Sequence, residues 1–164
     1  LGPLTRLIAG LRGGSLMKPV FTQWLAMYSS YVRQQFQRNS RGGGEWPDLA
    51  ESTKRARAKK KAAKRKGANI TERKFAILRD SGILFNALSI GVSGNYAKIM
   101  KDGVQYGFAP VQHGSDSATI QEIATFHDEG GKNGRPPKRE ILKVPTPQLA
   151  NAMLKAMSVR LRKI

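Results

Sequence analysis

Three adjacent polar residues, His127-Asp128-Glu129, are the first place in this sequence where chemistry could be concentrated. An imidazole beside two carboxylates offers ligands for a metal ion. Neighbouring residues on a helix point in different directions, however, so three in a row seldom converge on one ion. The chain has one other histidine, His113, and no cysteine, which excludes thiolate ligands and cysteine nucleophiles. The pattern therefore favours residues that only form the end of a helix. We expect neither a metal nor another cofactor.

Two further segments contain residue types found in active sites. Asp80-Ser81-Gly82 has a serine but lacks the Gly-x-Ser-x-Gly elbow that exposes a catalytic serine, so a cap and turn is the better interpretation. Gly42-Gly43-Gly44 could cradle a phosphate, but no Gly-Lys-Ser/Thr follows it and a helix, not a strand, is predicted before it. We therefore expect a loop there and a protein that is not an enzyme.

The strongest chemical signal is a basic tract at residues 54–66, where nine of thirteen residues are cations. Such a tract attracts phosphates or an acidic protein surface, and the formal charge of +18 on the whole chain adds to this field. No aromatic residue interrupts the tract, so contact with DNA would be electrostatic and independent of base sequence. The alternative is a solvated or disordered tract without a partner. The nine cations are Lys54, Arg55, Arg57, Lys59, Lys60, Lys61, Lys64, Arg65 and Lys66.

Helical spacing of apolar residues predicts the elements that position these segments. A helix is expected from about Lys18 to Arg38, because large apolar residues recur there at steps of three and four. Residues 49–66 have high helix propensity but almost no apolar face and many repelling charges. We expect them to form a conditional helix that orders when counter-charge is present. The apolar face of the first helix consists of Val20, Phe21, Trp24, Leu25, Tyr28, Tyr31, Val32 and Phe36.

The second half of the chain alternates turn and capping signals with short apolar runs. Asp80 or Ser81 is predicted to cap a short helix that extends to about Ser89. Lys101-Asp102-Gly103 lies between two alternating runs, which predicts a hairpin. Residues 138–144 are expected to form a strand or an extended arm.

Two more helices are predicted by their caps. Thr119-x-x-Glu122 is a capping box, and Gly130-Gly131 supplies the end of the helix that it begins. Thr146-Pro147 begins the last helix, whose apolar residues recur at four-residue steps. These apolar residues are Leu149, Met153, Met157 and Leu161.

Together these elements predict one α+β domain over residues 1–164. It has a small antiparallel sheet, made of the hairpin with or without a third strand, and three to five helices, with long ones near both termini. Residues 1–17 are expected to be an N-terminal extension and residues 50–70 a basic, flexible insertion. No apolar run approaches the roughly 20 residues that a membrane span needs, so no membrane partner is expected.

Five motifs occur in an order that resembles a known family. They are Gly43-Gly44-Glu45-Trp46-Pro47-Asp48-Leu49, the basic tract, Ile77-Leu78-Arg79-Asp80-Ser81-Gly82-Ile83-Leu84, Ala124-Thr125-Phe126-His127-Asp128-Glu129-Gly130-Gly131, and Arg135-Pro136-Pro137-Lys138-Arg139-Glu140-Ile141-Leu142. Over roughly Phe36 to Ile164 the chain thereby resembles the virion morphogenesis and tail completion proteins of tailed bacteriophages. It departs from that family in a long loop before the His127 motif and in the lack of a Phe in the Pro-rich motif.

The resemblance implies a structural component of the virion, assembled in the host cytoplasm. It would form a homo-oligomeric ring at the head–tail junction, a hexamer by first expectation and a dodecamer by second. Its partners would be the adjacent connector and the tail-tube or tail terminator proteins, with non-specific contact to genomic double-stranded DNA. The alternative function is a non-enzymatic basic nucleic-acid-binding protein, such as a ribosomal accessory subunit, which the +18 charge supports.

Besides the apolar face of the first predicted helix, two segments are candidates for contacts between subunits of such a ring. The first is Trp46-Pro47, although a tryptophan at this position can equally be a core anchor. The second is the Pro-rich arm, with Pro136, Pro137 and Arg139. A ring with heterologous interfaces places one patch of each subunit against a different patch of the next.

Overall fold

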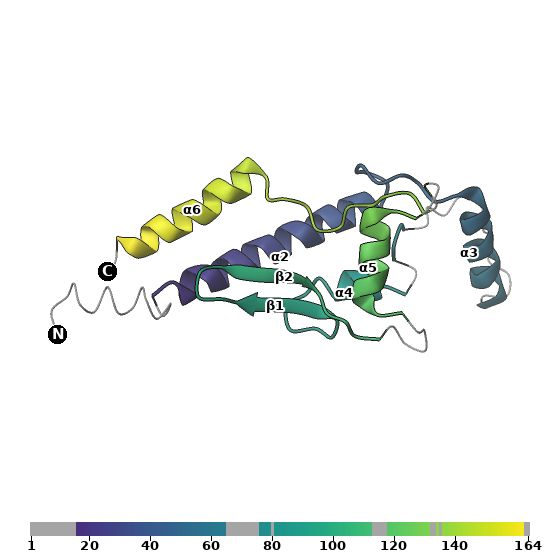
Figure 1. The fold of residues 1–164 in the computed structure, drawn as a ribbon. Helices are drawn as coiled ribbons and strands as arrows, with labels where there is room; N and C mark the ends of the chain where they lie inside the picture. The colour runs from purple at the N-terminus through teal and green to yellow at the C-terminus, as the bar shows by residue number, and fades with distance from the viewer. Residues whose placement is uncertain are drawn as a thin grey trace.

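The computed structural model describes residues 16–64, 76–79, 81–112, 118–131, 134 and 136–162, with the backbone alone for residues 60–64. These ranges contain five helices and a two-stranded antiparallel sheet, so the predicted α+β class with long helices near both termini is confirmed (Figure 1). The third strand left open by the sequence is not found in the described ranges. Residues 138–144 instead follow an extended path beside the helices.

The first helix, α2 (Lys18–Ser40), is the longest described helix, and the hairpin and the last helix pack against it (Figure 1). Pro19 occupies its first turn, where the missing N–H would have no helical partner in any case. Its apolar face is buried as predicted at five positions. They are Val20, Phe21, Leu25, Val32 and Phe36. After Ser40 the chain turns at Gly42, whose φ of +77° is easily adopted only without a Cβ.

The predicted hairpin is confirmed as β1 (Asn95–Ile99) and β2 (Val104–Phe108), which pair antiparallel with Asn95 opposite Phe108 and Ile99 opposite Val104. It lies along α2 (Figure 1). Tyr106 connects the two, because its ring meets the ring of Tyr28 edge-on at 5.4 Å. Its hydroxyl donates to the carbonyl of Leu88.

The short helix α4 (Ile83–Asn86) corrects the predicted cap. Gly82, with a φ of +78°, is the N-cap residue and offers no side chain. Ser81 Oγ lies 3.5 Å from the Ile83 amide, too far for a strong cap, and Asp80 lies outside the described residues. The helix ends at Asn86, before the predicted Ser89, because the chain enters a series of turns that leads into β1.

The predicted capping box is confirmed at the start of α5 (Ile120–Glu129). Thr119 Oγ1 accepts from the Glu122 amide at 3.2 Å, and the Glu122 carboxylate accepts from the Thr119 amide at 2.7 Å. Gly130, with a φ of +81°, ends the helix as predicted. A Cβ at Gly130 would lie 3.1 Å from the Lys138 amide nitrogen, so this end of α5 packs closely on the extended arm.

The last helix, α6 (Pro147–Leu161), begins at the predicted cap, where Thr146 Oγ1 accepts from the Leu149 amide at 3.3 Å. It lies against α2 (Figure 1). Trp24 Nε1 donates to the carbonyl of Met153 at 2.7 Å across this contact. The remaining helix, α3 (Glu51–Lys64), stands at the far end of the molecule. No helix in the described ranges is long and apolar enough to cross a membrane.

Candidate functional site

The basic helix α3 is the strongest candidate for a functional surface. It projects from the end of the fold opposite to the N-terminal half of α2 (Figure 1). The tract is helical over residues 51–64, and the expected dependence of this helix on counter-charge stays a prediction. Of its predicted contact residues, Arg65 and Lys66 lie outside the described residues, and only the backbone is described at Lys60, Lys61 and Lys64. The other four side chains fall into two pairs with different surroundings.

One pair, Lys54 and Arg57, holds α3 to the fold. Lys54 Nζ lies 2.8 Å from Asp48 Oδ2 and 2.8 Å from Glu51 Oε1. Hydrogen bonds to Asp48 and then Glu51 raise the pKa of Lys54 to about 12, and the same contact with Lys54 lowers the pKa of Asp48. Arg57 Nη1 donates to the carbonyl of Ala76 at 2.9 Å, where the chain returns from the insertion.

The other pair, Arg55 and Lys59, is exposed. The two residues are one helical turn apart, so they lie on the same side of α3. Neither makes an ion pair with another described residue. They are therefore the described cations of α3 that remain available to phosphates or to carboxylates of a partner.

The segment that leads into α3 is fixed to the Pro-rich arm. Arg139 is 4% exposed, and its Nη2 donates to the carbonyls of Pro47 at 3.1 Å and Asp48 at 3.4 Å. Burial lowers the pKa of Arg139. Trp46 Nε1 donates to the Glu140 carbonyl at 3.0 Å, and its ring contacts the Phe36 ring edge-on at 5.0 Å. These contacts connect residues 46–48 to residues 139–140, which lie far away in sequence.

These positions refine the predicted subunit contacts. Trp46 is 7% exposed, so it is the core anchor that the sequence offered as the alternative. The Arg139 side chain is also buried, and its hydrogen bonds are made within the same subunit. Neither side chain therefore has much exposed surface for contact with a neighbouring subunit. Pro47 is exposed, and Pro136 and Pro137 are half-buried. Their contact with a neighbouring subunit stays a prediction.

The His127-Asp128-Glu129 cluster is divided among separate local roles. His127 is half-buried, and burial lowers its pKa, with a further contribution from the charge of Arg139. The His127 carbonyl accepts from the Arg139 amide at 2.7 Å, and Asp128 Oδ1 accepts from the Ile141 amide at 2.9 Å. Glu129 is exposed. Among the described residues, no group of three or more His, Cys, Asp or Glu side chains is arranged to hold a metal ion.

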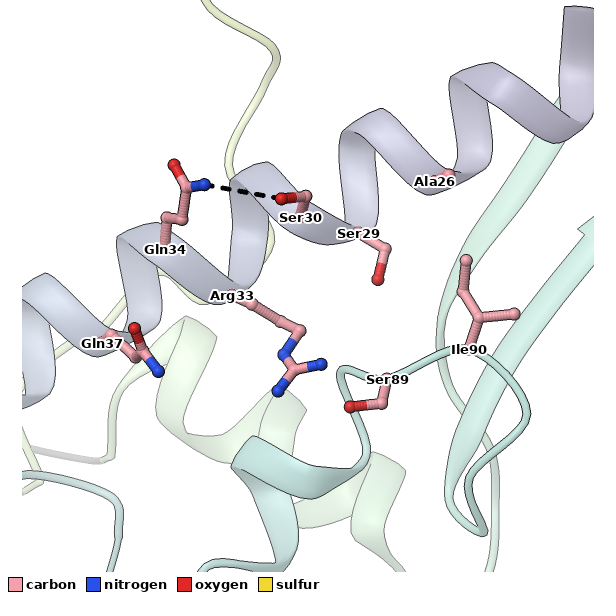
Figure 2. A pocket seen from close by; sticks show the side chains of 8 residues that line it. All are labelled: Ala26, Ser29, Ser30, Arg33, Gln34, Gln37, Ser89 and Ile90. Carbon is pink, nitrogen blue, oxygen red and sulfur yellow. Dashed lines mark hydrogen bonds between the residues drawn. The ribbon is translucent and has the colours of Figure 1, made fainter.

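A groove of about 460 Å³ lies along α2 beside the turns that follow α4 (Figure 2). Arg33 is the one ionisable residue that lines it, and its guanidinium lies 5.1 Å from the centroid of the Phe85 ring. The groove has serine hydroxyls but no histidine or carboxylate in its lining, so it lacks an acid–base pair. Its lining residues are Ala26, Ser29, Ser30, Arg33, Gln34, Gln37, Ser89 and Ile90.

The outer face of α5 is a surface that the sequence analysis missed. Phe126 is 52% exposed there, beside a groove of about 520 Å³. Glu122 lies four residues before Phe126 and Glu129 three residues after it, so all three share one side of the helix. An aromatic residue among polar ones on the side opposite Ile120 and Ala124 is the sequence signal that could have indicated this surface.

Comparison with protein-family models, with curated proteins and with solved structures gives no match to this chain. A functional assignment therefore depends on the residues and contacts described above.

Proposed function

We propose that this protein is a structural component of a tailed-phage particle, a tail completion or neck protein that forms a ring at the head–tail junction and joins the tail to the connector. The ordered motifs support this proposal. They also share one place in the fold, because each of the four motifs outside the basic tract contributes to a single hydrophobic cluster. The contributing residues are Trp46 from the first motif, Ile77 and Leu84 from the next, then Ala124 and Ile141.

The order of the five motifs is the observation that carries the proposal. Their apolar residues pack in the core of one domain, which is compatible with it. Here Trp46 and Ile141, ninety-five positions apart in the numbering, lie in the same cluster and are joined by the Trp46–Glu140 hydrogen bond.

The surface supports a role in assembly. Among the described residues, ten large apolar side chains are at least 37% exposed, and where they gather they offer surface that partners could cover. A ring would bury part of this surface between copies and part against the connector and tail-tube or tail terminator proteins. The most exposed of these side chains are Val144, Leu154, Phe126, Val159 and Ile90.

The projecting helix α3 suits the proposed position in the particle. In a ring, one helix per subunit would extend from the body with Arg55 and Lys59 unpaired within the subunit. Such cations can contact the phosphates of genomic DNA without reading its sequence, or they can contact carboxylates of an adjacent ring.

Negative-stain electron microscopy of the purified protein tests the proposal directly. We expect closed rings, hexameric by first expectation and dodecameric by second, either from the protein alone or after addition of its connector and tail partners. A strict monomer in sedimentation velocity, with and without these partners, would contradict the proposal. Genes for portal, capsid and tail-tube proteins beside the gene for this chain would support it independently.

A second candidate function is a basic nucleic-acid-binding protein such as a ribosomal accessory subunit. The exposed, unpaired Arg55 and Lys59 on a projecting helix favour it, together with the +18 charge. This function predicts binding to structured RNA and no rings under any condition.

A further inference from the structure

The last helix, α6, has more apolar surface than its contact with α2 covers. No residue of α6, all of which is described up to Leu161, is buried. Leu154 is 53% exposed and Leu161 is 43% exposed, and these two leucines lie two turns apart on one side of the helix. Val144, just before the helix, is 80% exposed. Apolar surface of this extent, concentrated on one element, is typical of an interaction site.

The charge around this surface restricts what can cover it. Lys155, Arg160 and Arg162 accompany the exposed leucines, and the sequence has no Asp or Glu between residues 141 and 164. A complementary surface must therefore combine apolar side chains with carboxylates. In a chain with eleven acidic residues against twenty-nine basic ones, such a surface is uncommon.

The outer face of α5 has this combination. Phe126 is half-exposed at the centre, with the carboxylates of Glu122 and Glu129 on either side along the helix. Hydrogen bonds from Thr119 lower the pKa of Glu122, so its carboxylate is charged at neutral pH. Glu129 has no ion pair with another described residue. The adjoining groove of about 520 Å³ has room for side chains of a partner.

The two surfaces lie in different parts of one molecule. Helix α6 lies along α2, whereas α5 lies near the C-terminal end of α2, beside α4 (Figure 1). We propose that α6 of one copy docks on the α5 face of the next copy, with Leu154 and Leu161 against Phe126 and with Lys155 and Arg160 near Glu122 and Glu129. Contact between two different patches is heterologous, and it closes into a ring when the rotation between copies permits.

A second copy fits better than an unrelated acidic protein, because both complementary surfaces occur on this chain. One kind of contact, repeated between copies, would cover both the basic apolar surface and the acidic apolar surface. An unrelated partner on α6 would leave Phe126 and its groove uncovered. The inference rests on the proposed ring, since it names the surfaces through which the ring would form.

The long-range repulsion between two chains of charge +18 does not oppose this contact at moderate salt. The Debye length is about 8 Å at 0.15 M ionic strength, so distant charges are screened while pairs in direct contact are affected much less. Assembly should therefore be measured at or above this salt concentration.

A mixing experiment tests the proposed surfaces. Phe126→Gln removes the α5 anchor, and Leu154→Asp with Leu161→Asp places charge on α6. All three positions are more than two-fifths exposed, so circular dichroism and thermal unfolding should match the wild type.

In sedimentation velocity at 0.15 M salt, we expect each variant to be monomeric. An equimolar mixture should form a one-to-one dimer and nothing larger, because one intact α6 face then meets one intact α5 face. Gln34→Asp, on the α2 groove, is the control that should keep wild-type assembly.

Cysteine cross-linking provides a second measurement that does not depend on the disruptive variants. Because the chain has no cysteine, Thr125→Cys on the α5 face and Lys155→Cys on α6 can report on each other alone. We expect a disulfide-linked dimer when these two variants are mixed under oxidising conditions. Thr125→Cys mixed with Gln34→Cys should give none.

The outcomes separate this inference from the proposed function. Rings that form equally well from wild type, Phe126→Gln and the double leucine variant would overturn the named surfaces and leave the ring proposal standing. Loss of assembly in both variants without a dimer or a cross-link in the mixtures would show that α6 and α5 each contact another partner, and would also overturn the inference. A wild type that is monomeric even with its connector and tail partners would contradict both.

Discussion

Helices α2 and α3 are neighbours in the sequence, but different forces hold them. Helix α2 buries five large apolar side chains and contacts the hairpin and α6, so its stability comes from packing. Helix α3 has no apolar face and is held in its N-terminal half by the Lys54–Asp48 ion pair and by Arg57 on the Ala76 carbonyl. The difference shows that the most highly charged described helix contributes no residue to the hydrophobic core.

The insertion that contains α3 also leaves and re-enters the fold at one place. Asn39 Oδ1 accepts from the Glu45 amide at 3.0 Å, and the Ser40 carbonyl accepts from the Ile77 amide at 2.8 Å. Both contacts lie at the C-terminal end of α2. The body can therefore be complete without α3, and changes to the two regions should affect different properties.

The largest effect is expected from a truncation in the core. Phe36 is 1% exposed, and its ring lies 5.0 Å from that of Trp46 and 5.6 Å from that of Phe85. Phe36→Ala should reduce the free energy of unfolding by about 3–5 kcal/mol, because a cavity remains where the ring was. Lys59→Ala, on α3, should change it by less than about 0.5 kcal/mol. Denaturant unfolding of both variants measures the contrast, and equal losses would show that α3 belongs to the cooperative core.

A pair of glycines tests how tightly the body is packed. Gly94 has a φ of +86°, and an added Cβ would lie 2.5 Å from Ile120 Cδ1. Gly91 has a similar φ of +81° but nothing within 4 Å of an added Cβ. Gly91→Ala should therefore cost about 1 kcal/mol from backbone strain, and Gly94→Ala about 2–3 kcal/mol from strain and contact together. Equal unfolding free energies for the two variants would mean that Ile120 moves aside freely.

Arg139 joins the two regions, so its replacement should separate them. Arg139→Met keeps the apolar stem but leaves the Pro47 and Asp48 carbonyls without their donor, which should cost about 1–3 kcal/mol. Hydrogen exchange of α3 should rise more than that of the hairpin, because residues 46–48 lead directly into α3. Lys138→Met, at the exposed neighbouring position, is the matched control. Unchanged exchange in α3 would show that the ion pairs of Lys54 suffice to hold it.

A smaller effect is expected from the pH dependence of stability at His127. Burial lowers its pKa below the ordinary value of about 6.5, so below that pH the unfolded chain binds more protons than the folded one. The contribution of neutral His127 to stability is therefore full above pH 6.5 and is lost as the pH falls through the folded-state pKa. His127→Gln should lose stability less steeply than the wild type in this window. Parallel curves of unfolding free energy against pH for the two proteins would contradict the assignment.

Much of this fold is predictable from the sequence because local signals agree with it. The apolar spacing of α2, the Asp-Gly turn of the hairpin and the capping box at Thr119 each specify an element without reference to the rest of the chain. The burial of Trp46 and Arg139 is different, since it depends on contacts across more than ninety positions. The division of the basic tract into Lys54 and Arg57 on one side and Arg55 and Lys59 on the other depends on where α3 attaches, which no local pattern reveals.

The final contrast concerns the two cation pairs of α3, where the expected change in stability is smallest and the change in binding is specific. Arg55→Gln with Lys59→Gln should leave the unfolding free energy unchanged. If these residues contact DNA phosphates, the slope of log affinity for duplex DNA against log salt should become shallower by about 1.8, since each lost phosphate contact removes about 0.9.

Lys54→Gln with Arg57→Gln removes the same charge but from side chains that have partners inside the subunit. It should raise hydrogen exchange in α3 and change the salt slope less. An equal change of slope in both double variants would mean that the total charge of α3 matters and its orientation does not. An unchanged slope in the Arg55 and Lys59 variant would favour carboxylates of a neighbouring ring as the target.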